Sequence, residues 1–139
     1  MPLNSKSDQN ILLIDYFENK DKDFWGALGD RPYYSVFQKI KKLLIDNNFD
    51  YKAFLKEYNK ETERDYSHGT IIPAFANFIV KLKGKKIDLA QMKCVNDVDS
   101  LYNLRLKSDY IDVNITKTEV IQKVKKAKEV ISFIKALGV

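Results

Sequence analysis

Apolar side chains recur at intervals of three and four residues along most of this chain, and that spacing predicts amphipathic helices. The clearest example is RPYYSVFQKIKKLLIDNN, residues 31–48, in which lysines separate the apolar positions. Asp30 can cap this helix, Pro32 fits its first turn, and Asn47 and Asn48 favour its end. Its expected buried positions are Tyr33, Val36, Phe37, Ile40, Leu43 and Leu44.

Similar patterns, separated by polar stretches, predict the other elements. Thr116 and Glu119 form a T-x-x-E capping box, which predicts the start of the last helix. Thr70 can cap the helix that follows it. The segment YIDVNI, residues 110–115, is the best candidate for a strand, although its alternation is loose. The expected helices cover residues 7–19, 31–48, 50–61, 71–82, 87–110 and 116–137.

The helix expected over residues 87–110 places two charges on or beside its apolar face. Its predicted inner positions are Val95, Val98, Tyr102, Arg105 and Asp109. One interpretation is an i, i+4 ion pair between Arg105 and Asp109 that holds two helices together, and structural ion pairs are common. The other interpretation is that Arg105 binds a phosphate or another subunit, because a planar guanidinium matches phosphate oxygens.

Composition agrees with a helical protein. The chain has 139 residues and is 45% hydrophobic, which is enough for one core. Only 5 glycines and 3 prolines are present, which disfavours a turn-rich β sandwich or barrel. We therefore expect a single helical domain over residues 1–139, of the all-α class, built as an up-and-down bundle of four to six helices.

Net charge and cysteine content are compatible with several functions. The net charge of +5 permits an anionic partner such as RNA, but it also fits an ordinary solvated surface. Cys94 is the only cysteine, so no intrachain disulfide forms, and we expect it in or beside the core. No apolar stretch approaches the ~20 residues of a membrane helix, and the start lacks the apolar region of a signal peptide. We expect a cytoplasmic protein without a membrane partner.

The candidate chemistry is limited. No glycine-rich phosphate loop is present, and His68 is the only histidine, so we expect neither a cofactor nor a multi-histidine metal site. His68 is expected at a helix start, in solvent or in a local hydrogen bond. A role as general acid or base is the alternative, since the pKa of histidine lies near neutrality.

Three segments, taken in order, carry a resemblance. RPYYSVFQKIKKLL is similar to the R-x-Y-Y-x-x-F helix of small HEPN proteins, the higher eukaryotes and prokaryotes nucleotide-binding family. SHGTIIPAFANFIVK resembles the segment that follows in that family. LYNLRLKSDYIDVNITKTEVIQKVKKAKEVISFIKAL resembles its R-x-x-A-D-Y segment and long final helix. Together they cover about residues 31–137.

The resemblance implies a HEPN-like core, often a homodimer, in a toxin–antitoxin or phage-defence system beside a minimal nucleotidyltransferase. Active relatives are metal-independent ribonucleases, in which an arginine stabilises phosphate charge and a histidine, separated from it by four to six residues, moves protons. Arg105 matches the arginine of this motif. Tyr110 stands where the histidine is expected, and a tyrosine, with a pKa near 10, is a poor proton shuttle at neutral pH.

The leading expectation is a HEPN-like module that acts by binding RNA, a nucleotide or a protein. One alternative is a ribonuclease whose catalytic site uses Arg105 with Tyr110, or with His68 brought from another helix or subunit. A second alternative is a purely structural partner subunit. The resemblance also suggests a nucleotidyltransferase antitoxin as a protein partner. The residues expected to form a binding or structural polar cluster are Arg31, Tyr33, Tyr34, Arg105, Asp109 and Tyr110.

Overall fold

The computed structural model describes residues 6–9, 11, 31–83, 88–108 and 116–137, and this part of the chain is helical with connecting turns. It contains no strand, so the all-α prediction is confirmed for the described residues. Most of the expected helix over residues 7–19, and the strand candidate at residues 110–115, lie outside them. The helices are α3 (Arg31–Asp46), α4 (Tyr51–Glu57), α5 (Ile71–Lys83), α6 (Leu89–Ser108) and α7 (Lys117–Ala136).

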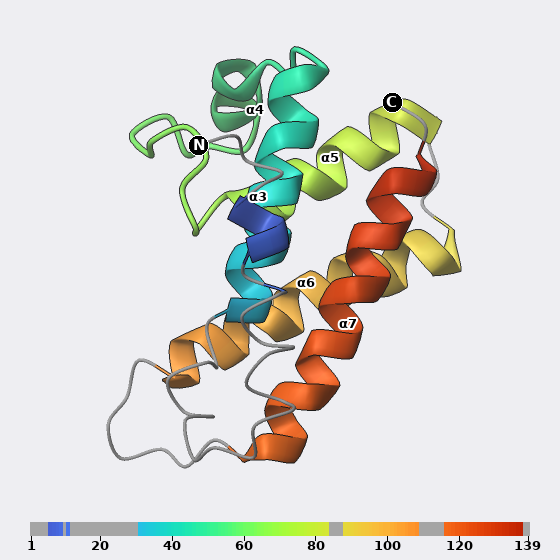
Figure 1. Ribbon diagram of the computed structural model, residues 1–139. Helices are drawn as coiled ribbons and strands as arrows, with labels where there is room; N and C mark the ends of the chain where they lie inside the picture. Colours follow the sequence, from blue (N-terminus) through green and yellow to red (C-terminus); the bar gives the residue numbers. More distant parts are fainter. Residues whose placement is uncertain (1–5, 10, 12–30, 84–87, 109–115, 138–139) are drawn as a thin grey trace.

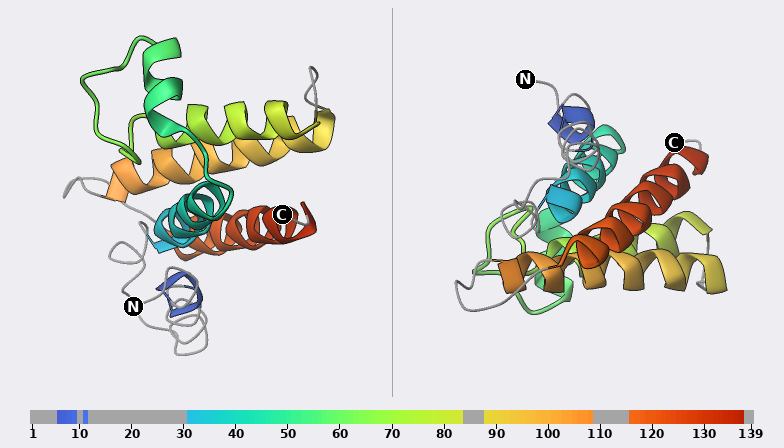
Figure 2. Two further views of the ribbon diagram at one scale, coloured as in Figure 1. Left: turned by 90° about the horizontal axis from the view of Figure 1, so that it is seen from above. Right: turned by 60° about the horizontal axis from the view of Figure 1, so that its bottom comes forward.

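Four of the helices form two layers. Helices α5 and α6 lie side by side and run in opposite directions, and α3 and α7 pack together across them (Figures 1 and 2). The short helix α4 lies at the end of α3 where that helix stops (Figure 1). Helices α3 and α6 are both central to the described part, because each contacts the other and also contacts α5 and α7.

The ends of the helices follow the expected turn chemistry. Asn48 has a φ of 53° directly after α3, and Asn47 donates its side-chain amide to the carbonyl oxygen of Leu43 at 2.8 Å, so the predicted end of this helix is confirmed. Asp50 caps α4 by accepting a hydrogen bond from the backbone N–H of Ala53 at 3.0 Å. Thr116 caps α7 in the same way, through the backbone N–H of Glu119 at 3.1 Å. Asp30, the expected cap of α3, lies outside the described residues.

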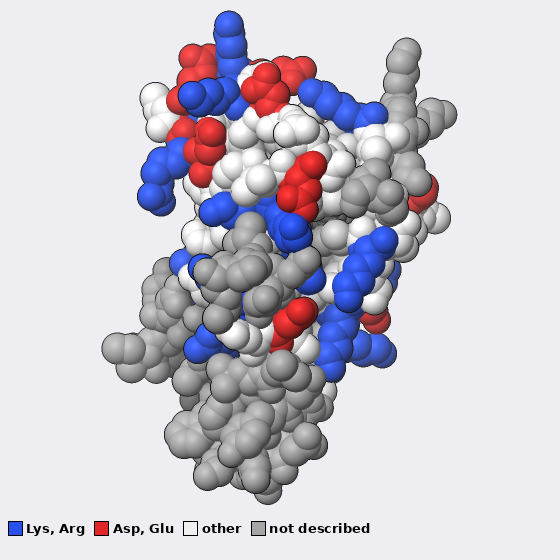
Figure 3. Space-filling view, turned by 45° about the horizontal axis from the view of Figure 1, so that its top comes forward, with Lys and Arg blue, Asp and Glu red and all other residues white. Residues whose placement is uncertain are grey.

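The core is built mainly from the predicted apolar faces. Tyr33, Val36, Ile40 and Leu44 of α3 have no exposed surface. The matching face of α7 is also buried and includes Val120, Val124, Ala127, Val130 and Ile134. Lysines occupy much of the remaining surface of α7, and they gather along the side of the molecule where this helix lies (Figure 3).

The predicted inner face of α6 is partly wrong. Val98 is buried as expected, and Val95 and Tyr102 pack against the core but are only half-buried. Arg105 is also only half-buried. The buried positions of α6 are Gln91, Cys94, Asp97, Val98, Leu101 and Leu104. The physical reason is that α6 packs against α3, α5 and α7, so more than one side of the helix is covered and the apolar stripe is broad.

Two sequence-based expectations concern Cys94 and the membrane. Cys94 is 5% exposed within the core, and burial raises the pKa of its thiol to about 12, which keeps the sulfur protonated. Its predicted role as a core residue is therefore confirmed. No helix in the described ranges combines the length and apolar character that crossing a bilayer requires.

Candidate functional site

A hydrogen bond between two distant residues lies at the centre of the candidate site. The phenol oxygen of Tyr33 on α3 is 2.9 Å from Nδ1 of His68, which precedes α5. Tyr33 has no exposed surface, and His68 is half-buried. The bond therefore fixes the imidazole against α3, 35 residues away in the sequence.

Aromatic rings of α3 surround the imidazole. Its ring centroid lies 4.5 Å from that of Phe37, 5.5 Å from that of Tyr33 and 5.6 Å from that of Tyr34. Residues 33, 34 and 37 share one side of a helix, because positions i and i+4 lie one turn apart. The aromatic side chains of α3 therefore also form the surface against which the imidazole of His68 packs.

Arg105 reaches the same place from α6. Its Cζ lies 5.7 Å from the ring centroid of Tyr34 and 5.8 Å from that of Tyr102, both within the range of a cation–π contact. Tyr102 lies one turn before Arg105, and its ring is 5.2 Å from that of Tyr33. The two tyrosines hold the guanidinium in a limited range of positions. We call the six residues of this site the Arg105 cluster: Tyr33, Tyr34, Phe37, His68, Tyr102 and Arg105.

The protonation states in the cluster follow from burial and charge. Partial burial lowers the pKa of His68, and the positive charges of Arg105 and Arg64 lower it further. Burial raises the pKa of Tyr33 well above its ordinary value of 10.0, and Arg105 opposes this only in part. At neutral pH the imidazole and the phenol are therefore both neutral. Arg105 is the charged member of the cluster, with Arg64 close enough to influence His68.

The Tyr33–His68 hydrogen bond is compatible with either neutral tautomer of the imidazole. If Nδ1 carries the proton, Nδ1–H donates to Tyr33 and Nε2 has a lone pair that can accept a proton. If Nε2 carries it, Tyr33 donates to Nδ1 and Nε2–H can donate to a ligand. In both cases the buried tyrosine orients the ring, and Nε2 is the nitrogen that a ligand would meet.

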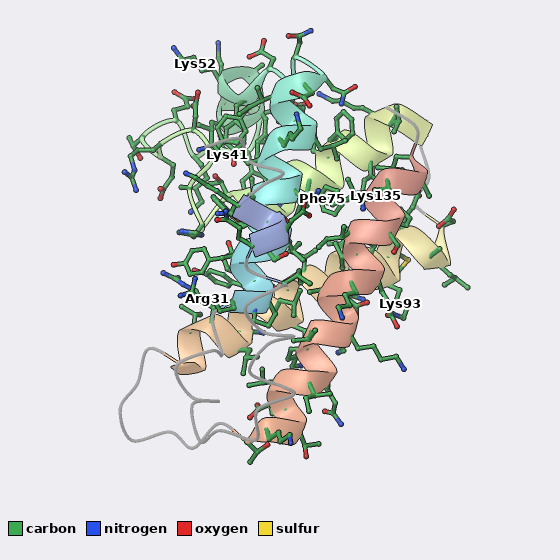
Figure 4. The ribbon with its side chains drawn as sticks, in the orientation of Figure 1. Arg31, Lys41, Lys52, Phe75, Lys93 and Lys135 are labelled. Carbon is green, nitrogen blue, oxygen red and sulfur yellow. The ribbon has the colours of Figure 1, made fainter. Side chains whose placement is uncertain are left out.

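The predicted site residues divide into three groups. The structure brings Tyr33, Tyr34, His68 and Arg105 together. Arg31 is the first residue of α3 and is half-buried, and Figure 4 labels it at the start of this helix. Asp109 and Tyr110 lie outside the described residues, so the expected Arg105–Asp109 ion pair and the role of Tyr110 stay predictions.

Sequence reasoning placed Phe37 and Tyr102 in the core and did not include them in the site. A signal for both was present, because Phe37 lies four residues after Tyr33 and Tyr102 lies three residues before Arg105. The partnership between Tyr33 and His68 had no such signal, since 35 residues separate them.

Within the described ranges, no three histidine, cysteine, aspartate or glutamate side chains come together as possible ligands of a metal ion. Comparison of the chain with models of protein families, with curated protein sequences and with solved structures gave no significant match.

Proposed function

We propose that this protein is a HEPN-like helical module that binds RNA, and that the Arg105 cluster holds a phosphate of the RNA backbone. The observation that carries the proposal is that Arg105 on α6 and His68 before α5 both contact the ring of Tyr34 on α3. The order of the three HEPN-like segments supports the same assignment, and it suggests a homodimer in a toxin–antitoxin or phage-defence system.

The electrostatics of the cluster favour an anionic ligand. Arg105 and His68 are basic groups placed close enough that the guanidinium lowers the pKa of the imidazole. A phosphate that contacts both would accept hydrogen bonds from the guanidinium and, in the tautomer with Nε2 protonated, from the imidazole. A guanidinium suits the role because its planar donors match two phosphate oxygens at once.

The rings of the cluster add a second element of recognition. Tyr34 and Tyr102 lie beside the guanidinium of Arg105 and are only half-buried, so part of each aromatic side chain is exposed at the site. Unpaired bases stack on such faces, whereas bases inside a duplex cannot. The cluster is therefore best suited to a single-stranded segment of RNA.

A second function, metal-independent RNA cleavage, is favoured by one specific observation. His68 is held neutral beside Arg105, which is the protonation state that a general base requires. Nε2 would take the proton of a ribose 2′-hydroxyl, and the 2′-oxygen would attack the adjacent phosphorus. The bond from phosphorus to the 5′-oxygen of the next nucleotide would break, and this oxygen would leave as a hydroxyl after taking a proton from water. Arg105 would stabilise the charge on the phosphate oxygens. His68 would then act in the place of the histidine that Tyr110 replaces.

The proposal is tested with a fluorescently labelled single-stranded RNA of mixed sequence in the presence of EDTA. We expect the anisotropy to rise with protein concentration, because the site needs no metal to bind phosphate. Products that end in a 2′,3′-cyclic phosphate would establish cleavage as well. Absence of binding up to about 100 μM protein would mean a binding free energy weaker than about 5.5 kcal/mol. That result would contradict the proposal and favour a structural partner subunit.

A further inference from the structure

Helix α7 has the largest net positive charge of the described helices, although α3 is also basic. Helix α7 has six lysines and two glutamates, which gives it a formal charge of +4, whereas the whole chain has a charge of +5. The other 119 residues therefore contribute only +1. The space-filling view shows the result as basic side chains along the side where α7 lies (Figure 3).

The lysines of α7 form two groups. Lys123 and Lys126 point toward α6, where Lys123 donates to the hydroxyl of Ser100 at 2.6 Å and Lys126 lies 3.9 Å from a carboxylate oxygen of Asp97. The second group is exposed and lies away from that contact. We call it the lysine face, and its members are Lys117, Lys125, Lys128 and Lys135.

The residues of the lysine face are aligned along one side of α7. At 3.6 residues per turn its four members fall within about 80° of one another around α7, and they span about 27 Å along the axis. Figure 4 shows Lys135 at the upper part of this helix. Lys125 and Lys128 also line an open hollow of about 550 Å³ beside α7, and its other lining residues are Ile121, Val124, Glu129 and Ser132.

Repulsion between the like charges of the lysine face opposes folding. Lys125 and Lys128 are three residues apart, so their like charges are neighbours on the helix surface. Burial lowers the pKa of Lys39 on α3, and the charge of Lys135 at one end of the row lowers it further, while Asp8 opposes the change. A long polyanion would offset this repulsion along the whole row.

The side chains beside the lysines point to nucleic acid and not to protein. None of the large apolar side chains that are exposed in the described part belongs to α7. Protein interfaces have an apolar centre and are depleted in lysine, so this face lacks the usual features of one. The only aromatic residue of α7, Phe133, is half-buried, so the face also lacks the stacking platform that single-stranded RNA requires.

We propose that the lysine face binds the phosphate backbone of duplex RNA, as a second contact separate from the Arg105 cluster. The choice of RNA rests on the proposed function. The mode of binding rests on the row itself, because lysine ammonium groups contact phosphates without reading the bases. The protein would then hold a structured RNA by its duplex on α7 and by an unpaired segment at the Arg105 cluster.

The test uses an RNA duplex of about 20 base pairs and mixed sequence, with the affinity measured from about 50 to about 300 mM salt. The variant carries K125Q, K128Q and K135Q, and glutamine preserves the helix. The control carries K52Q, K56Q and K60Q, which removes the same charge from exposed positions in and after α4. Each lost phosphate contact lowers the slope of log K against log salt by about 0.9, so the variant should lose about 2–3 units of slope.

The control should keep the slope of the original protein. Equal slopes for the variant and the control would overturn the proposal, as would absence of duplex binding by the original protein. Tighter binding to poly-glutamate or to phosphatidylserine vesicles than to the duplex would also overturn it. The Arg105→Ala variant separates the two proposals: it should still bind the duplex, even if the Arg105 cluster has no role in binding single-stranded RNA.

Discussion

Replacing Tyr33 by alanine is expected to lower the free energy of unfolding by about 3–5 kcal/mol, the usual range for a large buried aromatic side chain. Tyr33 has no exposed surface and lies between the rings of Tyr34, Phe37, His68 and Tyr102. Its removal leaves a cavity and also removes the hydrogen bond to His68. Because small domains are stable by only about 5–15 kcal/mol, a large part of the total would be lost.

Two variants separate the contributions. Tyr33→Phe removes only the hydroxyl and should cost about 1 kcal/mol, the net value of an ordinary hydrogen bond. Tyr58→Ala removes a tyrosine that is 50% exposed and should cost less than Tyr33→Ala by about 2 kcal/mol or more. Urea denaturation, followed by circular dichroism, measures all three. A loss below about 1.5 kcal/mol for Tyr33→Ala would contradict the burial of this ring.

Arg105→Ala is expected to weaken the binding of single-stranded RNA by about 10- to 150-fold. This corresponds to about 1.5–3 kcal/mol for the loss of a hydrogen-bonded charge. The guanidinium is half-buried and lies over the rings of Tyr34 and Tyr102, so we expect a smaller effect on folding, about 1–2 kcal/mol. Anisotropy with labelled RNA measures the first quantity and thermal denaturation the second.

The controls for this prediction distinguish binding from structure. Lys52→Ala removes one positive charge from an exposed position on α4 and should change the affinity less than threefold. If Arg105 is instead half of a buried ion pair with Asp109, Arg105→Ala and Asp109→Ala should each cost about 3–5 kcal/mol, and the double variant should cost less than their sum. A stable Arg105→Ala protein with undiminished RNA affinity would remove Arg105 from both roles.

The helices could be predicted from the sequence because each has strong local signals. Asn47 and Asn48 end α3, and Thr116 begins α7, through contacts that span at most four residues. The face of α6 could not be predicted as well. Three neighbouring helices cover it, and its apolar residues therefore do not form one narrow stripe.

Only part of the Arg105 cluster could be predicted from the sequence. A helix period places Tyr33, Tyr34 and Phe37 near one another, and it places Tyr102 near Arg105. It cannot show which loop returns to that surface. His68 reaches Tyr33 because the connection between α4 and α5 folds back over α3, and this depends on tertiary packing rather than on local spacing.

The most direct test of the account is the pKa of His68, measured by NMR with and without a short single-stranded RNA. His68 is the only histidine, so a single imidazole titrates. In the free protein its pKa should lie below the ordinary 6.5, because burial and Arg105 both disfavour the imidazolium. Arg105→Gln should raise it, since one positive charge is removed. Bound RNA should raise the pKa in the original protein by about one unit, because a phosphate stabilises the imidazolium, and this rise should be much smaller in Arg105→Gln. A pKa of His68 that stays the same when RNA is bound, in a protein that does bind it, would contradict the claim that Arg105 and His68 form one phosphate site.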